Sequence, residues 1–536
     1  MPAGAQAAEW DRVNHGVRVI IREYYWGNSS GDGVAPITCL ADQGDLCFGG
    51  DPEDQFCTLV PECRSQEDES EFLRRLRAAA ERRPADTYAM GQAVYAFMRL
   101  GRPIQAFQLA DACTAVGWWC ELLRGVVLHR TGQPNAAEVV FRQALERADP
   151  DLACRLRDIG PLIPGRDRRR YHREPCGSRD SLEAWFWWLT DPLFSVDGND
   201  RYAEHVARRV ETVLHEQIVE TSQSLHPDSH EDQLVRRGSE DSWRRLPYYT
   251  RFTSRRRARY HFVPEMDSLF GAIDAVGYRL DAGDGDEGFT PASGPFVTVP
   301  AQFVRFRQGD SMLVAAATDL ANSPAEDWSD PSVVLVLSDA PSSDPVVFGP
   351  MPGSTRVVFA APVVAAPYVA SLELTSAAGA AGRHRRGLPA LPASGFGASD
   401  ILLYEPTGGD PPGSRDEAIA AMLGTTDIEA GHPVGVYWEA YGIVEGEQIT
   451  RRIEIEGERP GLLARIAQAI GLGQSETPWL VSWVAAGRED VYRAAFDIDI
   501  QVLEPATYTL RLVLETERSG TAEAVRSFRI VAENPP

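Results

Sequence analysis

The sequence contains no lysine, so all 53 of its basic residues are arginine. This absence excludes Schiff-base catalysis, pyridoxal-phosphate chemistry, P-loop phosphate binding and protein-kinase activity, because each depends on a lysine amine. Arginine in place of lysine, beside abundant alanine, glycine and proline, is also typical of a GC-rich genome. The missing lysine therefore indicates codon bias rather than a selected surface.

Long apolar runs are also missing, and none approaches the ~18 residues that a transmembrane helix needs. The formal net charge is −24 at pH 7, and because an acidic chain repels phosphate backbones we expect no nucleic-acid partner. The Gly-x-Ser-x-Gly motif is absent, and no Gly-x-Gly-x-x-Gly run follows a strand and opens a helix. We therefore predict no cofactor and no catalytic residue, and favour a protein that is not an enzyme.

Cysteine is missing from the last 360 residues, and the eight cysteines lack the paired C-x2-C spacing of a zinc site. Their even number and irregular spacing favour disulfides in an oxidising compartment, although some could be unpaired and buried. On one helix Cys113 and Cys120 would lie ~10 Å apart, too far to bridge, but Gly117 predicts a turn between them. Cys154 and Cys176 are the natural next pair. The disulfide candidates are Cys39, Cys47, Cys57, Cys63, Cys113, Cys120, Cys154 and Cys176.

The N-terminus gives a second indication of export. Ala5-Gln6-Ala7 is similar to the cleavage end of a signal peptide, without its basic and apolar parts. With the cysteines, this predicts an extracytoplasmic protein that is periplasmic, on the cell surface or secreted. An upstream start or a trimmed sequence would account for the missing parts of the signal.

Composition and hydrophobic periodicity divide the chain into six segments. Helical spacing dominates the first half and strand-like alternation the second, where Ile453 and Ile455 alternate with charged residues. The predicted segments are a Cys-rich extended segment 1–65, a helical domain 66–175, a further helical region 176–290, a β-sandwich 291–375, a linker 376–396 and a C-terminal β-sandwich 397–536.

Small residues recur in the first helical domain. Gly132, Ala137 and Phe141 fall at the spacing of tetratricopeptide (TPR) positions, and Gly101 and Ala106 lie 31 residues before Gly132 and Ala137. Small residues there let two antiparallel helices approach closely. The pattern predicts a degenerate TPR-like pair whose concave groove could hold a partner peptide; a plain helical bundle is the alternative.

The next region resembles a known family. The residues that carry the resemblance are Trp187-Trp188-Leu189-Thr190-Asp191-Pro192, Gly198-Asn199-Asp200-Arg201, Glu204-His205, Arg208, Asp232-Gln233-Leu234-Val235-Arg236-Arg237-Gly238 and Trp243. They are similar to the helical part of the GWxTD-domain proteins, which are exported bacterial proteins, often from Gemmatimonadota. The resemblance implies an exported bacterial protein and carries over no catalytic residue.

Two further groups of residues are candidates for binding. The tryptophans and one arginine could hold a ligand such as a sugar, although tryptophan clusters more often form core packing. A histidine pair four residues apart with nearby acids could bind a metal, but Pro227 disfavours a regular helix there and a polar loop is the default. The ligand candidates are Trp118, Trp119, Trp185 and Arg236, and the metal candidates are His226, His230 and Asp232.

These observations predict a multidomain α + β protein, in which a disulfide-tied, TPR-like helical half precedes two antiparallel, Ig-like β-sandwiches. We expect a non-catalytic, envelope-associated scaffold that binds a protein partner or self-assembles. The alternative is an extracytoplasmic hydrolase or carbohydrate-binding protein, with its site between the helical half and the sandwiches.

Overall fold

The protein forms two compact units. One comprises Met1–Gly271 with Leu280–Ser293, and the other comprises Ala272–Arg279 with Gly294–Pro536. The computed structural model describes Val17, Ile20 and residues 66–163, 165–219, 234–235, 242–245, 252–255, 263–264, 280–281, 296–320, 331–351, 356–376, 381–444, 446–457, 479–486, 491–498 and 503–532. The Cys-rich segment 1–65 therefore lies outside the described residues, apart from Val17 and Ile20.

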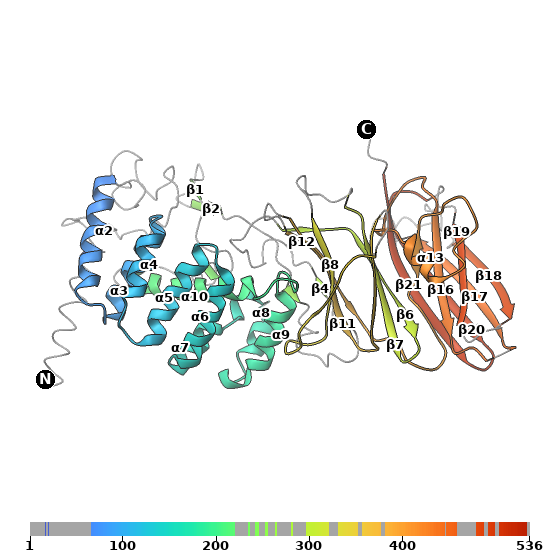
Figure 1. Cartoon of the computed structure of the whole chain (residues 1–536), viewed down its shortest axis with the longest axis horizontal. Coiled ribbons are helices and arrows are strands. Elements are labelled where there is room, and N and C mark those ends of the chain that lie inside the picture. The colour runs from blue at the N-terminus through green and yellow to red at the C-terminus, as the bar shows by residue number, and fades with distance from the viewer. Residues whose placement is uncertain are drawn as a thin grey trace, which may run out of the picture. The chain divides into compact units, whose positions relative to one another are not determined.

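The first unit is helical, with consecutive helices joined by short turns (Figure 1). Two short antiparallel strand pairs follow the helices. The helices are α2 (Gln66–Glu81), α3 (Thr87–Arg99), α4 (Pro103–Ala112), α5 (Gly117–Arg130), α6 (Pro134–Arg147), α7 (Pro150–Arg157), α8 (Gly165–Tyr171), α9 (Asp180–Thr190) and α10 (Asp200–Val219). The strands are β1 (Ser242–Arg245) with β2 (Phe252–Arg255), and β3 (Val263–Pro264) with β4 (Leu280–Asp281).

Local sequence signals explain where these helices begin. Asp86 accepts a hydrogen bond from the Ala89 N–H at the start of α3, and Asp149 caps α7 in the same way. Proline occupies the first position of α4, α6 and α7, where the missing N–H costs no intrahelical hydrogen bond. Between α5 and α6, Gly132 has a positive φ of 78°, a conformation that glycine adopts without strain.

Helix α10 is the central helix of this unit, because it packs against α3, α5, α6 and α7. The adjacent helices α5 and α6 approach closely where Gly125 meets Phe141: a Cβ built on Gly125 would lie 2.4 Å from the Phe141 ring. Glycine at this position therefore sets the spacing of the pair. Among the described residues, no helix has both the length and the apolar character needed to cross a membrane.

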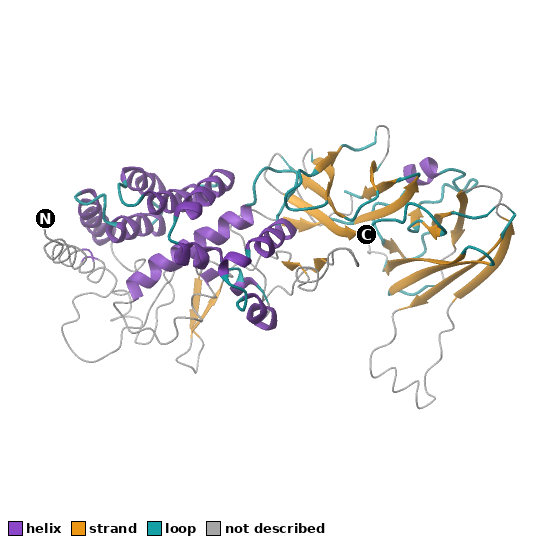
Figure 2. Cartoon of the chain, turned by 90° about the horizontal axis from the view of Figure 1, so that it is seen from below, coloured by secondary structure: helices purple, strands orange, loops and turns teal. Residues whose placement is uncertain are grey.

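The second unit is built from sheets (Figure 2). Among the described residues its larger sheets have the strand orders β5-β12-β11-β8-β9, β10-β7-β6, β13-β16-β14 with β19 also paired to β16, and β15-β21-β20-β17-β18. Pairing is antiparallel except between β5 and β12 and between β15 and β21.

The strand bounds are β5 (Phe296–Thr298), β6 (Ala301–Gln308), β7 (Ser311–Thr318), β8 (Ser332–Ser338), β9 (Val346–Phe348), β10 (Val357–Val364), β11 (Tyr368–Thr375), β12 (Ala381–Leu388), β13 (Gly397–Ala398), β14 (Leu402–Tyr404), β15 (Asp427–Glu429), β16 (Val434–Tyr441), β17 (Gln448–Gly457), β18 (Trp479–Ala486), β19 (Val491–Ile498), β20 (Thr507–Thr516) and β21 (Gly520–Val531). A short helix, α13 (Arg415–Ala420), lies between β14 and β15 in the chain.

Three buried cores join these sheets into successive layers. The first core lies between the β8 and β7 sheets and contains Phe303, and the last lies between the β16 and β20 sheets and contains Trp438. A middle core, with Phe306, Tyr404 and Tyr437, connects the β7 sheet to the β16 sheet. The two inner sheets are therefore buried on both faces, and the two β domains expected from the sequence share one continuous interior.

Polar side chains also connect the layers. Gln302 on β6 accepts a hydrogen bond from the Leu403 N–H at 2.8 Å and donates to the Leu403 carbonyl at 3.0 Å. Arg526 on β21 donates to the Phe303 and Ile401 carbonyls. Because these bonds lie in a buried interior, they fix the register between the layers as well as satisfying the groups.

The order of helices first and sheets second confirms the α + β prediction at that level. Within it, the structure differs from the sequence prediction at two places. The expected linker 376–396 contains strand β12, and the expected helical region 176–290 contains β1 to β4. The sequence of β12 predicts a linker because it is rich in arginine. In the structure Arg383 and Arg385 are buried, and Arg385 pairs with Glu373 at 3.2 Å. Hydrophobic periodicity assigns such arginines to the surface.

Candidate functional site in the helical unit

The start of α10 is held by its neighbours. Asn199 accepts the Tyr202 N–H at 2.9 Å, donates to the Trp187 carbonyl at 2.7 Å, and its own N–H donates to Glu138 at 2.5 Å. Gly198 before it has a positive φ of 87°. These contacts tie the first turn of α10 to α6 and α9, so they fix the position of the helix start.

A buried charged network follows along α10. Glu204, 1% exposed, meets His129 Nε2 at 2.5 Å and accepts from Arg208 Nε at 2.5 Å. Burial alone would raise the pKa of Glu204, but Arg208 and His129 hold that pKa well below its ordinary range. About two turns beyond Glu204, Glu211 accepts two hydrogen bonds from Arg130, of 2.8 and 2.6 Å. The network joins α10 to α5.

His205 lies on another side of the same helix. It is fully buried, neither ring nitrogen has a hydrogen-bond partner, and its ring centroid lies 5.0 Å from that of Trp187. Burial, with Arg209, Arg201 and Arg208 nearby, lowers the pKa of His205 well below its ordinary value. The imidazole is therefore neutral, and protonating it would place a fourth positive charge among the arginines.

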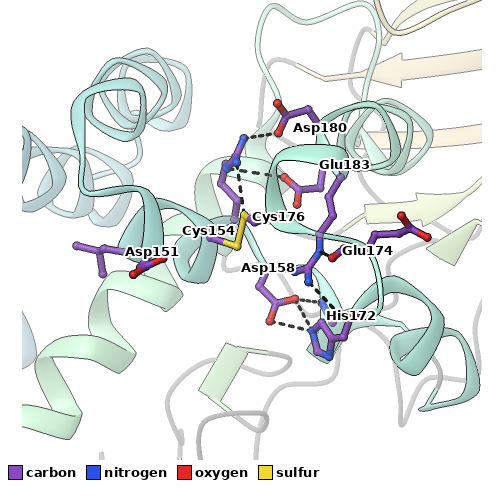
Figure 3. Close-up of a disulfide and its surroundings, with 12 residues drawn as sticks. Asp151, Cys154, Asp158, His172, Glu174, Cys176, Asp180 and Glu183 are labelled. Carbon is purple, nitrogen blue, oxygen red and sulfur yellow. Dashed lines mark hydrogen bonds and ion pairs between the residues drawn. A yellow bond between two sulfur atoms is a disulfide. The ribbon is translucent and has the colours of Figure 1, made fainter.

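The Cys154–Cys176 disulfide lies beside this helix (Figure 3). It ties α7 to the turn before α9, with the two Cα atoms 5.9 Å apart. Arg157 donates to Asp180 at 2.8 Å, and its Nη2 lies 3.9 Å from Cys176 Sγ. The predicted pair is thus formed, and Cys113–Cys120, with Cα atoms 5.6 Å apart, is formed as well.

A polar group connects the disulfide region to α10. Asp158 lies 3.0 Å from His172 Nε2 (Figure 3). Arg209 of α10 lies 3.5 Å from the Asp158 carboxylate. The Tyr171 hydroxyl donates to Glu183 at 2.7 Å, and burial, followed by the Glu183 charge, raises the pKa of Tyr171. The disulfide therefore joins α7 to the turn before α9, and the charge contact between Asp158 and Arg209 joins this region to the central helix.

The burial of these side chains limits the chemistry that they can carry out. Glu204, His205 and Arg208 are each at most 2% exposed, so their groups meet other side chains instead of solvent. In the part of the chain that the structure describes, no group of three or more histidine, cysteine or acidic residues could hold a metal ion. The network suits the holding of one helix against others.

The residues proposed from sequence fall into three groups. Trp119 is 4% exposed and donates from its indole to the Thr87 carbonyl at 2.9 Å, so it belongs to the helical core. Trp118 and Trp185 are half-buried, and Trp185 packs edge-to-face on Trp188 at 5.0 Å. The candidates outside the described residues are Arg236, His226, His230, Asp232, Cys39, Cys47, Cys57 and Cys63.

Sequence reasoning missed half of the network. His129, Arg130 and Glu211 carried no signal by themselves, whereas Arg201, Glu204, His205 and Arg208 were noticed only through the family resemblance. The sequence of α10 gives no signal for this burial, because its amphipathic pattern predicts one charged side that faces water. The pairing of those charges with α5 is visible only in the structure.

Comparison with known proteins identifies no family for the chain. No family model matches it, and no curated protein matches it. Among solved structures, it is similar to the crystal structure of red sea bream transglutaminase over 44% of this chain and 32% of that chain, with 9% sequence identity and a TM-score of 0.14. A likeness this weak carries no argument about fold or function.

Proposed function

We propose that the chain is a non-catalytic, exported bacterial scaffold, in which a TPR-like helical unit precedes two fused Ig-like β-sandwiches. One observation carries the proposal: Glu204, Arg208 and Glu211 of α10 are buried and are paired with charged residues of the chain itself. Glu204 meets His129 and Arg208, and Glu211 meets Arg130. Because these groups are paired with one another, they stabilise the packing of the helices. The carboxylates and the imidazole of this network are not open to a substrate.

The TPR-like assignment is supported by the helix pairs α3–α4 and α5–α6 and by the close approach of Gly125 to Phe141. In an open TPR unit, the concave groove receives a peptide. Here α10 packs on α3 and α5, so the chain supplies its own occupant for the groove. A partner therefore docks on other surfaces of the scaffold.

Export is supported by the paired cysteines, since disulfides persist outside the reducing cytosol. Thiol counting on the denatured, unreduced chain tests this part. At most four of the eight cysteines should react, because Cys113, Cys120, Cys154 and Cys176 are paired. Eight reactive thiols would contradict export.

The scaffold role is tested by cross-linking the tagged full chain in the bacterium that encodes it, followed by fractionation. We expect defined cross-linked products in an extracytoplasmic fraction. In a second arm, the Glu204→Leu variant, which weakens the packing of α10, should lose the cross-linked products that depend on the helical unit. A chain found only in the cytoplasm, without cross-linked products, would refute the proposal.

A further inference from the structure

We propose that strand β18 is an open sheet edge through which a second copy of this chain pairs, so that two five-stranded sheets join across a twofold axis. The inference deepens the proposed scaffold role and rests on it for its biological meaning. The surface used for assembly is the open edge of β18, and the partner is the same strand of another molecule.

The topology places β18 at the end of its sheet. It pairs with β17 over eight residues, from Ile455 opposite Trp479 to Gln448 opposite Ala486. On its other side, no strand among the described residues pairs with it. One edge of β18 therefore carries a row of backbone donors and acceptors that can hydrogen-bond to another strand.

Among the described residues, the other long sheet edges of the second unit are guarded. Strands β5, β9 and β15 have three residues each, and β9 lies between Pro345 and Pro350. Beyond the three residues that β15 covers, the edge of β21 carries Glu523. Strand β10 contains Pro362 and β19 contains Arg493. The edge of β6 is covered by Asp400, which accepts from the Arg305 N–H and donates from its own N–H to the Arg305 carbonyl. Short length, proline and charge are the devices by which proteins prevent edge-to-edge pairing.

Strand β18 has none of these devices. Its eight residues, WLVSWVAA, include no charge, no proline and no glycine, and they are rich in residues that favour strands. A long, uncharged edge of this kind is the form that accepts an additional strand. The contrast with the other edges shows that this chain guards its edges where pairing is unwanted.

Charge explains why the occupant is a second copy. At a net charge of −24, copies repel one another in general, so self-association requires a place where no like charges meet. A second β18 brings no charge to the edge. On the neighbouring strand β17, Arg452 is compensated by Glu454 at 3.0 Å and Glu515 at 3.6 Å. An antiparallel pair of identical strands is also self-complementary, as a twofold interface requires.

The test compares two serine-to-glutamate variants of the full, disulfide-intact chain. Ser482 lies near the middle of β18, directly opposite Arg452 in the register, so Ser482→Glu gains an opposite charge within the monomer. Across the twofold axis, the same change brings two carboxylates together. Ser527→Glu, on the exposed side of β21 in the same sheet, adds the same charge away from the edge and is the control.

Sedimentation velocity over a concentration series to about 100 μM should show a reversible dimer for the wild type. Ser482→Glu should weaken the dimer at least tenfold, and Ser527→Glu should leave it unchanged. Amide hydrogen exchange of residues 479–486 should slow with concentration in the wild type and in the control, but not in Ser482→Glu. An unchanged circular dichroism spectrum establishes that Ser482→Glu is folded.

Three outcomes would overturn the inference: a wild type that stays monomeric, a Ser482→Glu dimer of wild-type affinity, or β18 protected only when a different protein binds. None of them removes the scaffold role, because the cross-linking experiment tests that role separately. Conversely, a β18 dimer in a chain confined to the cytoplasm would support this inference and defeat the proposed function.

Discussion

Burying charged residues in the centre of the helical unit has a large cost in desolvation free energy. Removing a carboxylate from water is costly, and only close partners of opposite charge compensate for that cost. Glu204 has such partners in His129 and Arg208, whereas His205 has none and remains neutral. The two neighbouring residues therefore respond differently to substitution and to pH.

Replacing Glu204 with leucine should destabilise the helical unit by about 3–5 kcal/mol, because Arg208 and His129 remain buried without their partner. Urea unfolding followed by helical circular dichroism measures the change. Glu71→Gln removes an exposed ion pair with Arg74 on α2 and should produce no measurable shift. Equal effects of the two substitutions would show that the α10 network contributes no more than a surface pair.

Acid should weaken the helical unit through His205. Its pKa is lowered in the folded state, so the unfolded chain binds a proton that the folded chain does not. The free energy of unfolding should therefore fall as the pH drops below about 6.5. A series of urea titrations between pH 7.5 and 5 measures the slope.

His205→Leu should flatten this slope, because the group that charges on unfolding is gone. His432→Gln, which changes an exposed histidine of the β unit, should leave the slope as it is. A His205→Leu protein with wild-type pH dependence would locate the titrating group elsewhere.

At the scale of elements, the sequence predicted what depends on local signals. Gly117 between Cys113 and Cys120 and the strand alternation around Ile453 both correspond to observed elements. What it could not predict depends on distant partners. Strand β12 is a strand because Arg385 finds Glu373 on β11, and α10 is central because it meets α3, α5, α6 and α7.

The α5–α6 pair offers a direct test of close packing. Gly125→Ala should destabilise the helical unit by about 1–3 kcal/mol, because the added methyl group overlaps the Phe141 ring. Gly117→Ala is the matched control, since a Cβ there has no atom within 4 Å. Thermal unfolding compares the two variants.

A second substitution separates overlap from other causes. Phe141→Leu makes room for the new methyl group, so the Gly125→Ala, Phe141→Leu double variant should be more stable than the sum of the single effects predicts. Strict additivity would mean that the two positions do not interact.

For the whole molecule, the layered interior of the β unit predicts its cooperativity. The middle core with Phe306, Tyr404 and Tyr437 belongs to both halves of that unit, and Gln302 bonds across it. Calorimetry of the full chain should therefore show one transition for the entire β unit, beside that of the helical unit. Gln302→Ala should lower that single transition, because it removes the buried acceptor of the Leu403 N–H and the side-chain donor to the Leu423 carbonyl. Two separate β transitions would contradict a shared interior.

The position of α10 in the sequence also constrains how the chain is made. The helices that surround it come first, and the helix that completes their centre ends only at residue 219. During synthesis, α3 to α7 therefore emerge before the element that buries their inner side chains. The packing around α10 cannot form until α10 has emerged, and a chain that stops before residue 200 would leave that surface permanently open.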